Sequence, residues 1–344
     1  MFNKLMNNYY FGKAGKGDFT EDDLPTNRWQ LFLETLRVRF SALTRLNLMY
    51  VVVWLPALIV IFLGVMGALN IANSIDLGDG QSAFSMQAML QQEEAAETGE
   101  VIEIPEVMSA SDAYDSLLGI LMTTLMLLVP AIAITGPCTA GVAYVTRNWA
   151  RDEHAFIWSD FKDAVKENWK QSIVVSLITG ALPLVVFMGW RFYGSMAATQ
   201  PIMIIPQVLI LMIGIIWAIS VTYMHPLIVS YRLKLRDVFR NAILLAVARL
   251  PMSVGLRILH CVPVAIGLAI AFLWNPSYAL LFLMFYYLLF GFSISRFITA
   301  SYTNAVFDRF INSHIEGAQV NRGLRAEDDD DYDDDEELDE NGAE

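Results

Sequence analysis

Arg257 and His260 are the side chains best placed to do chemistry inside an apolar segment of this sequence. They lie one helical turn apart near the start of the apolar run Met252–Trp274, and Pro263 follows. A charge inside a bilayer costs at least ~2.5 kcal/mol, so such residues often mark functional sites. A proline also frees a backbone carbonyl nearby. The pair predicts an intramembrane polar site, whereas the arginines at the ends of other apolar runs are expected to extend toward the interface: Arg191 and Arg296.

The other reactive residue types form no catalytic or metal-binding pattern. The four histidines lack the i, i+4 pairing of a helical zinc site. Cys138 and Cys261 lie in or beside apolar runs, where we expect them to pack as small apolar residues. The string Asp76–Gly80 lacks the alternating ligands of a calcium loop. Because no nucleophile motif, P-loop or paired-carboxylate arrangement occurs either, we expect no enzymatic activity, no cofactor and no metal.

A second feature is the interruption of a long apolar run by Pro130 and then by the string Thr135–Gly141. This pattern predicts a kinked or broken helix, with the candidate bend at Thr135, Gly136, Pro137 and Thr139. In transporters such breaks line substrate sites. The alternative is a bend repaired by neighbouring hydroxyl groups and by close packing through the glycines.

The elements that must carry these residues are membrane-spanning helices. The chain is 55% hydrophobic and only 17% charged over 344 residues, which is too apolar for an ordinary soluble domain. Six runs approach or exceed the roughly 20 residues that span a bilayer as a helix: Leu46–Leu69, Ser116–Tyr144, Gln171–Trp190, Pro201–Met224, Met252–Trp274 and Ser277–Phe297. We predict an all-α integral membrane protein of about six transmembrane helices with cytoplasmic amphipathic helices.

The lysines and arginines predict its orientation. They gather in the first 45 residues and in the loops after the second and fourth runs, whereas residues 70–115 hold ten acids and no cation. By the positive-inside rule, both termini are cytoplasmic. The expected location is the plasma membrane of a bacterium, with the lipid bilayer as partner and no nucleic acid.

The expected segments follow from this threading. Residues 1–45 form a cytoplasmic segment with an interfacial helix, 46–298 the six-span domain, 299–326 a cytoplasmic C-terminal helix and 327–344 an acidic tail. The six-span domain includes an extracytoplasmic acidic loop, 70–115, and cytoplasmic loops, 146–170 and 225–251. The tail holds 13 acids and no cation, a composition typical of disorder.

Amphipathic patterns lie in the cytoplasmic segments around residues 26–45, 159–170 and 232–242. Each could lie on the anionic inner leaflet or dock a partner. In the loop after the second run we predict a cytoplasmic recognition strip for a partner, made of Arg147, Asn148, Arg151, Glu153, His154, Trp158 and Asp160.

Three strings carry a resemblance to a known family. They are Thr135–His154 with its continuation to Lys170, Pro226–Pro251, and Gly291–Asp308. Together they resemble the signature of the YesL family, bacterial membrane proteins of unknown function. This chain differs from the shorter members by some seventy inserted residues that include the acidic loop.

The resemblance implies a role by association only, because genes of the family often lie beside carbohydrate-uptake ABC transporters. We therefore predict a non-enzymatic accessory or regulatory component linked to carbohydrate (oligosaccharide) ABC-type uptake, with an ABC transporter permease or another membrane protein as partner. A homo-oligomer is compatible with the sequence. The alternative is a permease in its own right, and the remote alternative a membrane-embedded enzyme.

Overall fold

The computed structural model describes residues 24–78, 80–95 and 105–325. The predicted acidic tail, 327–344, and the first 23 residues of the N-terminal segment lie outside these ranges. The described chain is helical, and its only strand-like feature is an isolated bridge between Ile75 and Met108. The predicted all-α class is therefore confirmed.

Six helical segments of the described chain are long and apolar enough to cross a membrane, which confirms the six predicted spans. They are α2 (Arg28–Ser74), α4 (Ala110–Trp149), α5 (Ser159–Ala197), η2 with α6 (Pro201–Met203 and Ile204–Ser230), α8 (Leu250–Leu273), and the segment from α9 (Pro276–Tyr286) through the π-helical η3 (Tyr287–Gly291) and α10 (Phe292–Phe310) to η4 (Asn312–His314). At 1.5 Å per residue, the 47 residues of α2 have a length along the helix of about 70 Å, well beyond a hydrocarbon core of ~30 Å.

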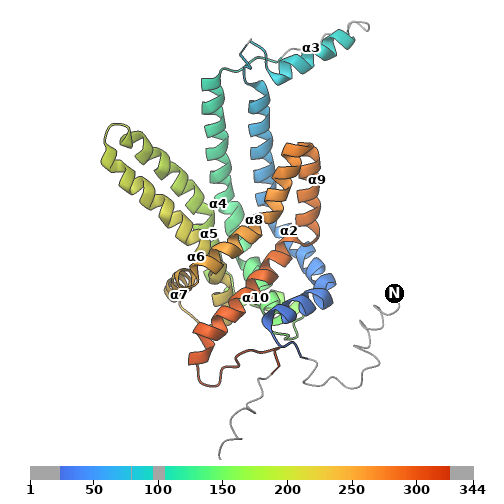
Figure 1. The fold of residues 1–344 in the computed structure, drawn as a ribbon, viewed down its shortest axis with the longest axis vertical. Coiled ribbons are helices and arrows are strands. Elements are labelled where there is room, and N and C mark those ends of the chain that lie inside the picture. Colours follow the sequence, from blue (N-terminus) through green and yellow to red (C-terminus); the bar gives the residue numbers. More distant parts are fainter. Residues whose placement is uncertain (1–23, 79, 96–104, 326–344) are drawn as a thin grey trace, which may run out of the picture.

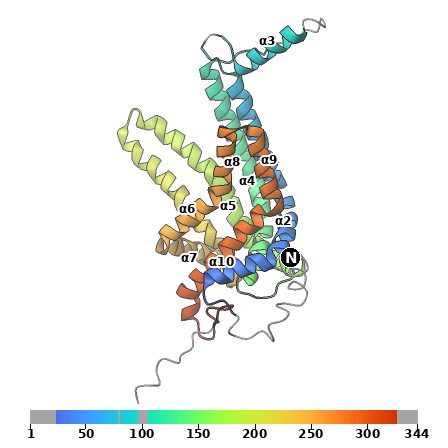
Figure 2. The ribbon, with the colours of Figure 1, turned by 45° about the vertical axis from the view of Figure 1, so that its right-hand side comes forward.

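Both expected boundaries of the six-span domain fall inside helices. Residues 45 and 46 both belong to α2, and residues 298 and 299 both belong to α10. No proline or glycine stands at either place, so the helical backbone continues from one segment into the next. Figure 2 shows the dark-blue first part of α2 lying across the base of the bundle, at an angle to the part that rises from it.

The helices form antiparallel neighbours with the described chain ends together at one end of the bundle, here called the basal end (Figure 1). An ion pair between Arg28 and Asp308 and a hydrogen bond from Arg325 N to Pro25 O (3.0 Å) join those chain ends. The short helix α7 (Leu235–Ala248) lies at the basal end, and α3 (Ala83–Ala95) at the opposite, distal end. The hairpin of α5 and α6 diverges from the other spans toward the distal end in both views.

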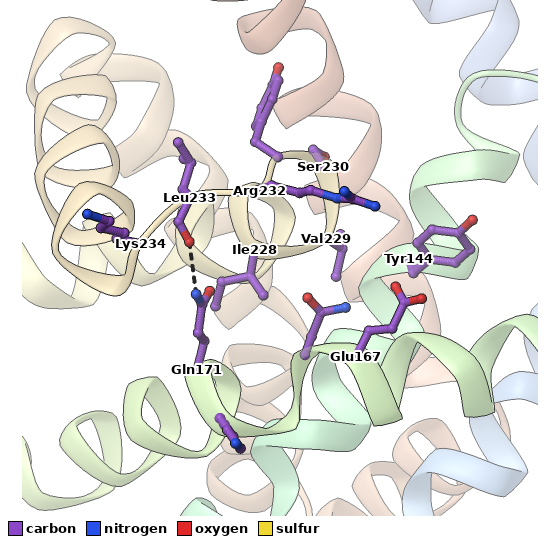
Figure 3. Close-up of a pocket in the computed structure, with 12 residues that line it drawn as sticks. Tyr144, Glu167, Gln171, Ile228, Val229, Ser230, Arg232, Leu233 and Lys234 are labelled. Atoms are coloured by element: carbon purple, nitrogen blue, oxygen red, sulfur yellow. Dashed lines mark hydrogen bonds between the residues drawn. The ribbon is translucent and has the colours of Figure 1, made fainter.

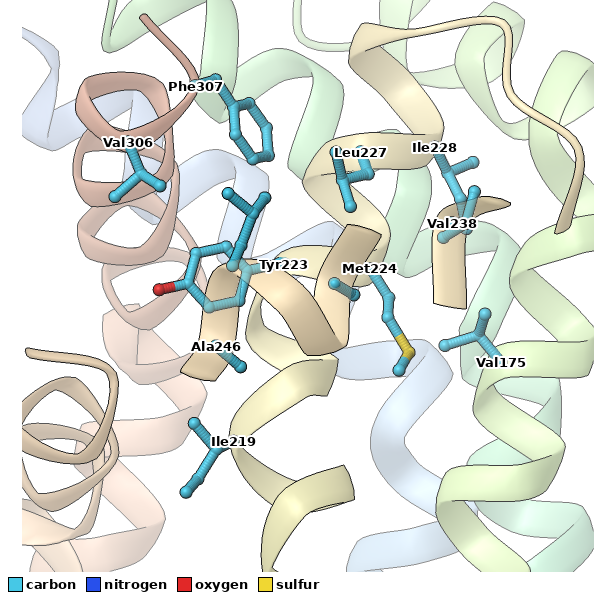
Figure 4. Packing of buried hydrophobic residues seen from close by; sticks show 12 residues of the cluster. Val175, Ile219, Tyr223, Met224, Leu227, Ile228, Val238, Ala246, Val306 and Phe307 are labelled. Atoms are coloured by element: carbon cyan, nitrogen blue, oxygen red, sulfur yellow. The ribbon is translucent and has the colours of Figure 1, made fainter. Parts of the chain in front are cut away.

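Buried apolar side chains concentrate toward the basal end. One cluster joins α5, α6, α7 and α10 around Tyr223, Met224 and Phe307 (Figure 4), and a second joins α2, α4 and α10 around Tyr50, Trp149 and Phe297. Lipid tails supply no hydrophobic drive for packing between helices, but water at the membrane boundary does. Large apolar side chains elsewhere on the spans remain exposed, as expected for surfaces in contact with lipid.

A polar clamp holds the last span at the π-helical segment η3. Asn47 of α2 is fully buried, and its Nδ2 donates to the carbonyls of Tyr287 and Leu288, both at 2.8 Å. Its Oδ1 accepts from Ser293 N at 2.9 Å. A π-helical turn disturbs the regular backbone ladder, and this one side chain satisfies three backbone groups there.

Candidate functional site at the basal end

A cavity of about 730 Å³ lies at the basal end between α4, α5 and the segment that links α6 to α7 (Figure 3). Gln171 Nε2 donates to Leu233 O at 2.8 Å and ties α5 to that linking segment. The cavity lining includes Tyr144, Glu167 and Arg232. This site lies where α5 and α6 meet the basal surface, and its size suits a small molecule.

The cavity is lined in part by polar side chains that have no partner in the described chain. In the described chain, neither the Glu167 carboxylate nor the Arg232 guanidinium has an ion pair, and Ser230 Oγ is buried without a hydrogen-bond partner. A carboxylate accepts, a guanidinium donates and a hydroxyl does both. The arrangement can therefore bind a polar ligand. Sequence reasoning missed this cavity, although two of the strings that carry the family resemblance supply most of its lining.

Part of the predicted recognition strip is occupied by the protein's own C-terminal segment. Arg151 Nε contacts Glu153 Oε1 at 3.0 Å, and Arg322 Nη1 reaches the same oxygen at 3.3 Å. Arg151 Nη2 also donates to Gln319 O at 3.4 Å. Gly323 packs on the Arg151 carbonyl, with φ +82° and only 3.1 Å left for a Cβ. The groups predicted to meet a partner thus meet residues 319–323.

Asp308 of α10 is the centre of a second set of basal contacts. Its carboxylate pairs with Arg28 and accepts from Asn312 Nδ2 at 2.5 Å and from Asn321 N at 3.2 Å. Tyr231 OH donates to Asn312 Oδ1 at 2.7 Å, and burial raises the pKa of this phenol to about 12, so it keeps its proton. These contacts join the start of α2, the end of α6 and the C-terminal segment.

Arg147 and Asn148 of the strip also make hydrogen bonds within the protein. Arg147 Nη1 donates to Asn148 Oδ1 at 3.1 Å, and the Arg147 carbonyl accepts from Asn304 Nδ2 at 3.2 Å. Asn148 is buried. Its carbonyl closes the end of α4 by accepting from Arg151 N and Glu153 N.

The rest of the strip faces outward. Trp158 is 64% exposed and its neighbour Phe156, which the prediction did not include, is 62% exposed. The His154 ring lies edge-on to Phe156 with centroids 4.6 Å apart, and Asp160 Oδ2 accepts from Phe156 N at 2.8 Å. We call Phe156 and Trp158 the aromatic pair. The structure therefore divides the strip into an inward polar part and an outward aromatic part, and its role in recognition stays a prediction.

The candidate bend is a region of close helix contact. The helix α4 runs uninterrupted through Thr135, Gly136, Pro137 and Thr139. A Cβ on Gly136 would lie 2.4 Å from Ser172 O of α5. Thr139 Oγ1 donates to Thr135 O at 2.8 Å and lies 2.6 Å from Tyr50 OH of α2. These contacts match the alternative of hydroxyl repair and glycine packing, while the bend itself stays a prediction.

The candidate intramembrane site lies elsewhere, on α8. His260 Nε2 donates to Ser295 O at 3.1 Å and lies 3.3 Å from Thr299 Oγ1 of α10. Arg257 Nε is buried without a hydrogen-bond partner. An apolar pocket of about 190 Å³ adjoins His260, and its lining does not include Thr135–Gly141. The candidate bend and the pair Arg257 and His260 therefore do not line a common pocket.

Comparison with known proteins gives a family without an assigned activity. The profile of a protein family of unknown function, DUF624, matches residues 116–190. The chain is 27% identical over 126 residues to the uncharacterized protein YesV of Bacillus subtilis and 29% identical over 138 residues to the uncharacterized protein YesL of the same organism. These alignments cover 36% and 40% of this chain and 59% and 62% of the two relatives, less than two thirds of either. No solved structure matches.

Proposed function

We propose that this YesL-like chain is a non-enzymatic membrane protein that serves as an accessory or regulatory component of carbohydrate ABC-type uptake. The observation that carries the proposal is the basal face, where the aromatic pair stands exposed beside a network that joins the chain's own ends. Exposed aromatic side chains on a rigid polar support are typical of docking surfaces. The carbohydrate link rests on the gene neighbourhood of the family that the sequence resembles.

In this proposal the basal end faces the cytoplasm of a bacterium. The basic segments of the sequence, including those around Arg151 and Arg232, lie at that end, which is the arrangement expected from the positive-inside rule. A docking partner would then be the membrane subunit of an importer that shares the same bilayer.

The non-enzymatic assignment is supported by how the spans use their hydroxyl groups. Thr139, Thr179 and Ser220 each donate to a carbonyl one turn earlier in their own helix. This is a structural use that offsets the cost of a polar group in an apolar surrounding.

A permease is the second candidate, and the basal cavity favours it. A volume of about 730 Å³ with an open carboxylate at Glu167 and an open guanidinium at Arg232 could receive a polar solute entering or leaving the membrane domain.

The test is co-purification in mild detergent with a coexpressed ABC importer membrane subunit from the same host. Retention of that subunit by the parent chain, reduced at least ten-fold by the double change Phe156→Ser and Trp158→Ser, is expected. The matched control is Trp190→Ser with Phe192→Ser, an exposed aromatic pair near the other end of α5. Equal retention by both variants would contradict docking through the aromatic pair.

Solute uptake by proteoliposomes that contain only this chain separates the two candidates. An accessory protein gives no uptake above empty vesicles. Uptake by the chain alone, lost on Glu167→Gln or Arg232→Gln, would establish the permease in its place.

A further inference from the structure

Three helices that contact one another, α6, α8 and α10, carry basic side chains within their spans. His225 lies near the end of α6, Arg257 and His260 in the first half of α8, and Arg296 in the first turns of α10. His260 Nε2 donates to the carbonyl of Ser295, the residue before Arg296, at 3.1 Å. In the described chain no carboxylate pairs with either arginine. We call these four residues the basic cluster.

Several side-chain nitrogens of the basic cluster have no hydrogen-bond partner in the described chain. His225 is only 3% exposed, and both of its ring nitrogens lack a hydrogen bond. Arg257 Nε and His260 Nδ1 are buried and also unpartnered. Buried polar groups are almost always satisfied, so the unpartnered N–H groups of Arg257 and His225 indicate a missing acceptor. Repulsion between two arginines in a low-dielectric surrounding indicates that the acceptor is negatively charged.

A phosphate group fits this donor set better than a single carboxylate. It carries several acceptor oxygens, and each guanidinium presents a planar fork that can bind two of them. The neutral imidazole of His225 can donate one further hydrogen bond, whereas the N–H of neutral His260 is already donated to Ser295 O.

The surroundings of the basic cluster indicate which kind of molecule carries the phosphate group. The pocket of about 190 Å³ that adjoins His260 and Ser295 is otherwise lined largely by apolar and aromatic side chains, among them Pro263, Tyr286 and Tyr287. Arg257 precedes His260 by one turn, and Arg296 follows Ser295 directly. A phosphate with an acyl chain attached would place its charge at the arginines and its hydrocarbon in the pocket. Basic pockets between spanning helices bind anionic lipid headgroups in this way.

We propose that the basic cluster and its adjoining apolar pocket form a binding site for the phosphate and one acyl chain of an anionic phospholipid. The site is separate from the aromatic pair and from the basal cavity, so it does not depend on the proposed function. Interfacial snorkelling explains a lone terminal arginine, but it does not explain why His225 is buried with both ring nitrogens unpartnered.

The experiment is native mass spectrometry of the full chain in detergent, titrated separately with dioleoyl-phosphatidylglycerol and dioleoyl-phosphatidylcholine. We expect at least a ten-fold preference for phosphatidylglycerol in the first binding event. The double change Arg257→Gln and Arg296→Gln should abolish that preference. Arg191→Gln is the matched control, because this arginine lies at the distal end and contacts Tyr114 OH at 2.8 Å.

Equal binding of the two lipids by the parent chain would overturn the proposal, even if the double variant failed to fold. Retained preference in a folded double variant would overturn it as well. Inorganic phosphate at 10-fold molar excess over the lipid is the third arm. If phosphate alone binds and displaces phosphatidylglycerol, the lipid source is wrong; if the lipid stays bound, the result supports the proposal.

Discussion

Replacing Asn47 with alanine should loosen the last span at its π-helical segment. The side chain makes three hydrogen bonds to backbone groups of the segment from Tyr287 to Ser293, and it is fully buried. Hydrogen bonds between membrane helices average ~0.6 kcal/mol, and intramolecular ones in general reach ~1.5 kcal/mol. The loss of three, with their backbone partners left unsatisfied, should lower the free energy of unfolding by about 2–4 kcal/mol.

The assay is reversible unfolding in mixed detergent micelles followed by circular dichroism. The matched control is Asn70→Ala, an asparagine of the same helix whose side chain is exposed. That control should stay within ~0.5 kcal/mol of the parent protein, as surface changes usually do. A value for Asn47→Ala within the same range would refute the clamp.

Three further changes test the packing and the basal contacts. Gly136→Ala should lower the free energy of unfolding by about 1–3 kcal/mol, because its Cβ would lie 2.4 Å from a carbonyl of α5, whereas Gly119→Ala has open space and should be neutral or slightly stabilising; thermal melting checks both. Asp308→Ala should cost about 2–4 kcal/mol in chemical unfolding, because three donors lose their acceptor, and an unchanged midpoint would contradict its central place. The pKa of Tyr231 is raised to about 12 by burial, above an unfolded value of ~10, so its stabilising contribution should be complete below pH 10 and be lost as the pH rises toward 12. Unfolding at pH 9 and pH 11 should show this loss in the parent chain and a smaller one in Tyr231→Phe.

The basic cluster shows how much of a site can be predicted from the sequence. The polar character of Arg257 and His260 was predictable, because a charge in an apolar run is visible in the sequence. Their neighbours His225 and Arg296 were not predicted as part of the same group. They lie 32 or more positions away along the chain and on other helices, and only helix packing brings them near.

The recognition strip shows the same limit in another form. Its cations and aromatic residues were identified from the sequence, but Arg151 contacts Gln319, which is 168 positions away. A strip that looks available in the sequence is partly covered by the chain itself. Phe156 was overlooked because one aromatic residue carries no signal of exposure.

The sequence by itself determined that this is an all-helical membrane protein with six spans, since apolar length and composition are local properties that the bilayer selects directly. It also carried the family resemblance. Only the tertiary structure decided that Asn47 clamps the last span, that the C-terminal segment covers Arg151 and Glu153, and that a polar cavity opens beside Glu167. Each of these depends on contacts between residues far apart in the chain, which form only after the spans have inserted and packed.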